Sequence, residues 1–180
     1  MNAARVVSAS ISARGPTCAA LLSSGGVREL VALLESGSDH CRLNAACALS
    51  HLAAVSPAAC SAVLDAGALP LLLTLLEHGD AAVSANAMGA LLQLLTHDHS
   101  LHALLLEAGA FGLILNMASP GAEPRALANA HDALRALAAG ENARLRSALV
   151  EAGVLDVLAR VLALPVSYTH LRAHETDSYL

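Results

Sequence analysis

Residues 65–76 read Asp65-Ala-Gly-Ala-Leu-Pro-Leu-Leu-Leu-Thr-Leu-Leu76, a glycine turn that leads into an apolar run. The same feature returns along the chain at separations of 42, 42 and 44 residues, each time with large apolar residues at the fifth and eighth positions after the glycine. The glycines are Gly25, Gly67, Gly109 and Gly153. A fixed period of this length predicts a solenoid built from repeated structural units.

A second set of residues recurs with the same period. An asparagine followed by alanine returns at separations of 42, 42 and 43 residues, at Asn2, Asn44, Asn86 and Asn129. Two independent series with one period are not expected by chance. The chain is therefore predicted to be a repeat protein.

Each unit is predicted to contain three helices. The first begins at a proline, as at Pro16 or Pro57, with Ser56 as an N-cap, and it ends at the recurring glycine, which adopts a left-handed conformation without strain. The second spans residues such as 69–77, and the third runs from an acidic cap such as Asp80 to about residue 96. Apolar residues recur at i, i+3, i+4 and i+7, as in packed amphipathic helices.

The segments 65–76 and 85–95 resemble the second and third helices of the armadillo repeat family, and the resemblance covers residues 2–164. It implies an all-α fold, a right-handed armadillo-type α-solenoid in which three-helix repeats form a superhelix. HEAT repeats are the alternative, although they usually have two helices and lack the glycine after the first. Ankyrin and tetratricopeptide arrays are excluded, because their periods are about 33 and about 34 residues.

The period also predicts where the units begin and end. Residues 17–56, 57–98 and 99–140 form three complete repeats, while residues 1–16 match the third helix of a preceding repeat and residues 141–165 form part of a following one. The array is thus expected to be truncated at both ends. Because natural solenoids finish with polar caps, we expect the isolated array to be marginally stable or to self-associate through its apolar ends.

The last fifteen residues do not continue the pattern. Residues 166–176 resemble the translation of a transposase adapter used in short-read DNA sequencing, and they show no helical periodicity. We therefore interpret residues 166–180 as a non-native tail and leave them out of the fold prediction.

The resemblance implies that the third helices line a concave groove. Armadillo proteins commonly hold an extended peptide in this groove with asparagines, whose amides offer donors and an acceptor to a peptide unit. In the alternative interpretation, each asparagine bonds a neighbouring backbone group within the repeat. The predicted partner-binding residues are Asn44, Cys47, His51, Asn86, Gln93, Asn129 and Asp132.

Nuclear-import adaptors of the family carry a tryptophan and an asparagine at two fixed positions of the third helix. The first position holds Cys47, Gly89 and Asp132 here, and the second holds His51, Gln93 and Ala136. With none of these tryptophans or asparagines present, an importin-type role is disfavoured.

Composition and charge exclude several other classes. The net charge is −5, which gives no basic surface for nucleic acid, and apolar runs stop near ten residues, too short for a membrane span. Four cysteines in apolar helical contexts suit a reducing compartment, so we expect the cytoplasm or the nucleus. No cofactor is expected.

Few residues suggest catalysis or a metal site. Cys47 with His51, and His99 with His102, each offer two potential ligands at helical spacing, short of the four that structural zinc requires. His97, Asp98, His99 and His102 are interpreted as surface residues at the turn between a third helix and the next first helix. We therefore predict no catalytic residues and no metal ligands.

The function predicted from the sequence is that of a non-catalytic scaffold, which binds a partner protein or an extended peptide along the groove. The alternative is the recognition array of a larger enzyme, such as an armadillo-containing ubiquitin ligase.

Overall fold

The computed structural model describes residues 16–36, 38–119, 121–139, 143–151, 153–156 and 159. These residues form helices only, without strands. The predicted helix of the preceding repeat, most of the second helix expected at 154–164 and the tail at 166–180 lie outside them. The helices are α2 (Pro16–Ser24), α3 (Gly26–Ser36), α4 (Asp39–Ala53), α5 (Pro57–Asp65), α6 (Ala68–His78), α7 (Ala81–His97), α8 (Leu101–Glu107), α9 (Phe111–Met117), α10 (Pro124–Ala139) and α11 (Ala143–Glu151).

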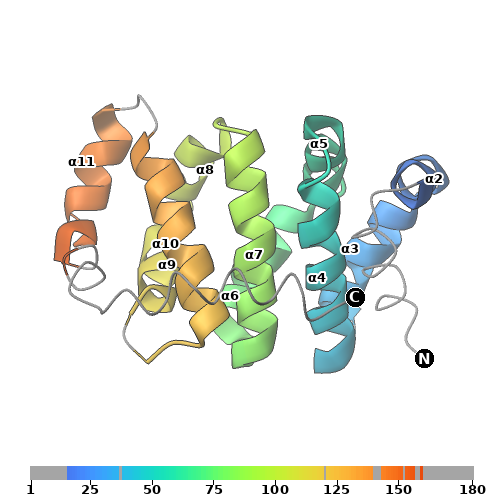
Figure 1. Ribbon diagram of the computed structural model, residues 1–180, viewed down its shortest axis with the longest axis horizontal. Coiled ribbons are helices and arrows are strands. Elements are labelled where there is room, and N and C mark those ends of the chain that lie inside the picture. The colour runs from blue at the N-terminus through green and yellow to red at the C-terminus, as the bar shows by residue number, and fades with distance from the viewer. Residues whose placement is uncertain are drawn as a thin grey trace.

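The helices follow one another in triplets, as the period predicts. Helices α2 to α4, α5 to α7 and α8 to α10 form three successive units, and α11 follows them (Figure 1). The third helices of the units, α4, α7 and α10, lie side by side, with α7 packed against both neighbours (Figure 1). The all-α solenoid predicted from the sequence is confirmed.

The recurring glycines take the predicted conformation. Gly25, Gly67, Gly109 and Gly153 have φ values of 79°, 83°, 66° and 85°. This is the left-handed region, which only glycine enters at little cost. Each glycine therefore ends the first helix of its unit and turns the chain into the second.

The predicted caps are also in place. Ser56 Oγ accepts a hydrogen bond from the Ala59 N–H at 3.2 Å at the start of α5, where Pro57 occupies the first turn. Asp80 Oδ1 accepts one from the Val83 N–H at 2.7 Å at the start of α7. These bonds satisfy N–H groups that a helix start leaves without an intrahelical partner.

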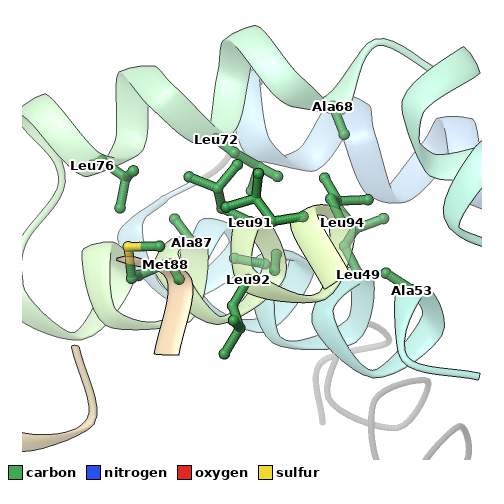
Figure 2. Close-up of a cluster of buried hydrophobic side chains, with 14 of the residues drawn as sticks. Leu49, Ala53, Ala68, Leu72, Leu76, Ala87, Met88, Leu91, Leu92 and Leu94 are labelled. Atoms are coloured by element: carbon green, nitrogen blue, oxygen red, sulfur yellow. The ribbon is translucent and has the colours of Figure 1, made fainter. Parts of the chain in front are cut away.

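Leucines and alanines form the continuous core. In Figure 2, Leu72 on α6 lies beside Leu91 on α7, next to Leu94 and close to Leu49 on α4. These leucines are 0% exposed, so truncation of Leu91 to alanine is expected to cost about 2–5 kcal/mol. Alanines buried on the third helices allow the helix backbones to approach closely: Ala45, Ala46, Ala48, Ala87, Ala90, Ala130 and Ala133.

No single helix among the described residues is long and apolar enough to cross a membrane. Among these residues, α5 and α6 together reach the length and apolar composition of a membrane span, but a bend of 79° separates the two helices. Both helices bury core residues inside the array, including Val63 and Leu72.

Candidate binding face

The predicted binding residues lie along one stripe of each third helix. Successive members are three or four residues apart, which places them on the same side of a helix. The stripe is half-exposed at Asn86 and Gln93, whereas the other residues of α7 between 83 and 95 are buried. We call this surface the third-helix face; it comprises Asn44, Cys47, His51, Asn86, Gly89, Gln93, Arg125, Asn129, Asp132 and Ala136.

Each asparagine of the series forms one hydrogen bond inside the array. Asn44 Nδ2 donates to the His40 carbonyl of its own helix at 2.7 Å, and Asn129 Nδ2 donates to the Ala85 carbonyl of α7 at 3.4 Å. Asn86 Oδ1 accepts from Arg125 Nη1 at 3.5 Å. These are contacts of the kind expected if the asparagines stabilise the repeats.

The second polar atom of each amide has no hydrogen bond to any described residue. In Asn44 and Asn129 this atom is the amide oxygen, because the nitrogen donates to a backbone carbonyl. In Asn86 it is the amide nitrogen, because the oxygen accepts from the Arg125 guanidinium. Asn44 is only 7% exposed, whereas Asn86 and Asn129 are half-exposed. Asn86 and Asn129, on neighbouring helices, are therefore the half-exposed residues of the series, and each keeps one amide atom without a hydrogen bond to a described residue.

Gly89 allows the close approach of three helices at the middle of the face. A Cβ atom there would lie 3.1 Å from Asn129 Nδ2 and 3.4 Å from Ser50 Oγ. Because Gly89 has no side chain, the Asn129 amide of α10 can lie directly against α7, close to Ser50 of α4.

Successive third helices are displaced along their axes. Gly89 is equivalent to Cys47 of the preceding repeat, yet it lies against Ser50, three residues further on. In the same way Asn129, the equivalent of Asn86, lies against Gly89. Each displacement of three residues amounts to about 4.5 Å, close to one turn.

Cys47 and His51 form the predicted i, i+4 pair. Cys47 Sγ and His51 Nδ1 are 3.9 Å apart. This hydrogen bond raises the pKa of His51, against the effect of partial burial and of the positive charge on Arg125. Cys47 is half-buried and His51 is exposed, so the pair lies on the third-helix face.

Charged side chains near the face are largely paired. Asp132 forms an ion pair with Arg135 on α10, and Asp39 forms one with Arg42 on α4 at 2.7 Å. Arg125 has no such pairing among the described residues. The sequence analysis missed Arg125, which lies one turn before Asn129, because its equivalents His40 and Ala82 are chemically unlike it.

The interpretation of His97, Asp98, His99 and His102 as surface residues of a turn is wrong for His102. His102 lies in α8 and is 4% exposed, with its ring against that of His99 at a centroid distance of 5.1 Å. Its Nε2 atom is buried without a hydrogen-bond partner. Within the part of the chain that the structure describes, no three His, Cys, Asp or Glu side chains gather in a way that could hold a metal ion.

Comparison with known families supports the architecture. The armadillo/beta-catenin-like repeat model matches residues 17–54 and 56–91, which correspond to the first two complete units. No curated protein sequence matches the chain.

Solved structures match over almost all of the chain. A designed armadillo repeat protein in complex with the peptide (KR)4 superposes with a TM-score of 0.81 at 25% identity, covering 92% of this chain and 68% of its own. A computationally designed armadillo repeat protein for modular peptide recognition gives 0.82 at 28% identity, with the same two coverages of 92% and 68%. A further designed armadillo repeat protein gives 0.76 at 28% identity, covering 84% of this chain and 63% of its own. With its recurring glycines, three-helix units and aligned third helices, the chain has the armadillo repeat fold, and its residues 17–54 and 56–91 match the armadillo/beta-catenin-like repeat.

Proposed function

We propose that the chain binds an extended peptide segment of a partner protein across the third-helix face. The observation that carries the proposal is the pair Asn86 and Asn129. They lie half-exposed on neighbouring helices, and each keeps one amide atom unbonded to any described residue. An extended peptide offers N–H and C=O groups that such amides can bond.

The structural relatives support the same function. One designed relative is described in complex with the peptide (KR)4, and another as made for modular peptide recognition. The face of this chain has neither the tryptophan nor the asparagine positions of import adaptors, so an importin-type role remains disfavoured.

In this proposal the array acts as a non-catalytic scaffold in the cytoplasm or the nucleus. Cys18, Cys41, Cys47 and Cys60 form no disulfide bond, which suits a reducing compartment. The alternative role, as the recognition array of a larger enzyme, uses the same face and the same residues.

Selection from a phage-displayed library of random peptides on the full chain tests the proposal. Binding of a selected peptide is then measured by fluorescence anisotropy with Asn86→Ala, Asn129→Ala and the control Asn116→Ala. Asn116 is exposed on α9, away from the face. A hydrogen bond contributes about 0.5–1.5 kcal/mol, so each face variant should weaken binding about two- to tenfold while the control does not.

Thermal unfolding of the same variants separates binding from folding. Asn129→Ala also removes a bond between α10 and α7, so some loss of stability is expected for that variant. The proposal fails if no peptide is selected. It also fails if selected peptides bind both face variants as tightly as the unmodified chain.

A further inference from the structure

Arg125 is a cation on the third-helix face that has no anionic partner among the described residues. Its side chain is exposed on the first turn of α10, and its Nη1 atom reaches across to Asn86 Oδ1 on α7 at 3.5 Å. No carboxylate of a described residue lies within ion-pair distance of it. A neutral amide oxygen is a weak partner for a guanidinium, which pairs best with two oxygens of a carboxylate.

The carboxylates at the margin of this face are already engaged. Asp132 is held by Arg135, and Asp39 by Arg42. Asp80 Oδ1 and Glu123 Oε2 accept hydrogen bonds from the backbone N–H groups of Val83 and Ala126 at 2.7 and 2.8 Å, at the starts of α7 and α10.

Asp80 and Glu123 keep their negative charges at these helix starts, whereas Arg125 is a cation of the face that forms no ion pair with any described residue; the whole chain carries a net charge of −5.

Two further groups add to the anion-binding character around Arg125. Asn86 bonds Arg125 through its oxygen, and the Nδ2 donor of the same amide has no hydrogen bond to any described residue. His51 on α4 is exposed and close enough to Arg125 for the guanidinium charge to lower its pKa, although the hydrogen bond with Cys47 has the larger and opposite effect. Arg125, Asn86 and His51 thus come from three successive third helices, α10, α7 and α4.

We propose that Arg125, with Asn86 Nδ2 and His51 beside it, binds the side-chain carboxylate of an aspartate or glutamate in the partner peptide. This inference rests on the proposed function and assigns the chemistry of the ligand. The partner is an acidic peptide, in contrast to the (KR)4 peptide of the designed relative.

The selection with random peptides tests the inference when it is repeated on two variants. Arg125→Gln removes the guanidinium, and Arg28→Gln removes an equally exposed arginine from α3, away from the face, with the same change in net charge. Aspartate or glutamate should be enriched at one position of the peptides selected on the unmodified chain and on Arg28→Gln. The enrichment should disappear on Arg125→Gln.

A synthetic peptide from the selection, amidated at its C-terminus so that only side chains carry carboxylates, gives the quantitative test. Replacing its acidic residue with the corresponding amide should weaken binding about three- to tenfold on the unmodified chain, and more at low than at high salt. On Arg125→Gln the same replacement should have no effect.

The possible outcomes separate this inference from the proposed function. If selected peptides bind but lack acidic enrichment, or if Arg125→Gln keeps the preference for the acidic peptide, the carboxylate site is refuted while peptide binding stands. If no peptide is selected at all, both proposals fail.

Discussion

Gly67 and Gly112 differ in backbone conformation but not in the space around them. Neither has an atom within 4 Å of the place where a Cβ would stand, but Gly67 has a φ of +83° and Gly112 lies within helix α9. Alanine at Gly67 is therefore expected to lower the free energy of unfolding by about 1–2 kcal/mol through backbone strain. Alanine at Gly112 should raise it by up to about 1 kcal/mol through helix propensity.

Urea unfolding followed by far-UV circular dichroism measures both changes. Because neither substitution creates a contact, the difference between the two variants isolates the conformation of the backbone. A stabilising effect of alanine at both positions would show that the left-handed turn is not required at Gly67.

Some residue-scale features are readable from the sequence and others are not. The conformation of Gly67 follows from its recurrence, because a glycine repeated at one place in every unit marks a backbone constraint. Periodicity also places Asn44 and Asn129 at equivalent positions of two third helices, α4 and α10. It does not reveal that Asn44 bonds its own helix while Asn129 bonds the neighbouring one, since this depends on how the helices are displaced.

At the scale of the element, α8 packs a histidine where the equivalent helices bury a cysteine. His102 is equivalent to Cys60 and Cys18, which are 1% and 7% exposed. His131 on α10 likewise replaces Met88, which is 0% exposed. The sequence contained this signal, but grouping His102 with the nearby histidines hid it. Alignment of the repeats places both histidines at positions that are buried in other units; His102 is buried as well, and His131 is half-buried.

Burial of His102 predicts an acid-sensitive contact between α8 and α7. Burial lowers the pKa of His102 from 6.5, and the charge of His99 lowers it further, against a backbone hydrogen bond with Leu95 and the charge of Asp98. As the pH falls, His102 is therefore protonated at a higher pH in the unfolded chain than in the folded chain. The stability that the neutral ring contributes is complete above about pH 6.5 and is lost as the pH falls from there through the lower, folded-state pKa.

Thermal unfolding at about pH 7.5 and about pH 5.5 measures this effect. The melting temperature should fall on acidification, and the fall should be smaller for His102→Gln. The exposed His78 serves as the control, because His78→Gln should leave the fall unchanged. An equal fall in the unmodified chain and in His102→Gln would rule out this origin of the pH dependence. His131, whose pKa burial also lowers, accounts for part of the fall that remains.

At the scale of the whole molecule, the two junctions between third helices are alike. Both show the same three-residue displacement, around Ser50 and Gly89 and around Gly89 and Asn129. A second copy of residues 57–98 inserted after residue 98 is therefore expected to fold as an additional unit. Because the stability of a solenoid is approximately a sum over units and their interfaces, the urea midpoint should rise.

Circular dichroism and light scattering check this prediction. Helicity per residue should stay constant in the lengthened chain, and the dependence of the unfolding free energy on urea should become steeper as more surface is exposed. A lower midpoint, or aggregation that the parent chain does not show, would mean that the junctions are not interchangeable.

The displacement of the third helices also bears on how such arrays diverge. Ser50, Gly89 and Asn129 meet at one place, although they occupy different positions within their repeats. A line drawn straight across the helices therefore joins residues that an alignment of the repeats assigns to different columns. Covariation among members of this lineage is expected between columns three residues apart in successive units, and a column-by-column comparison would overlook it.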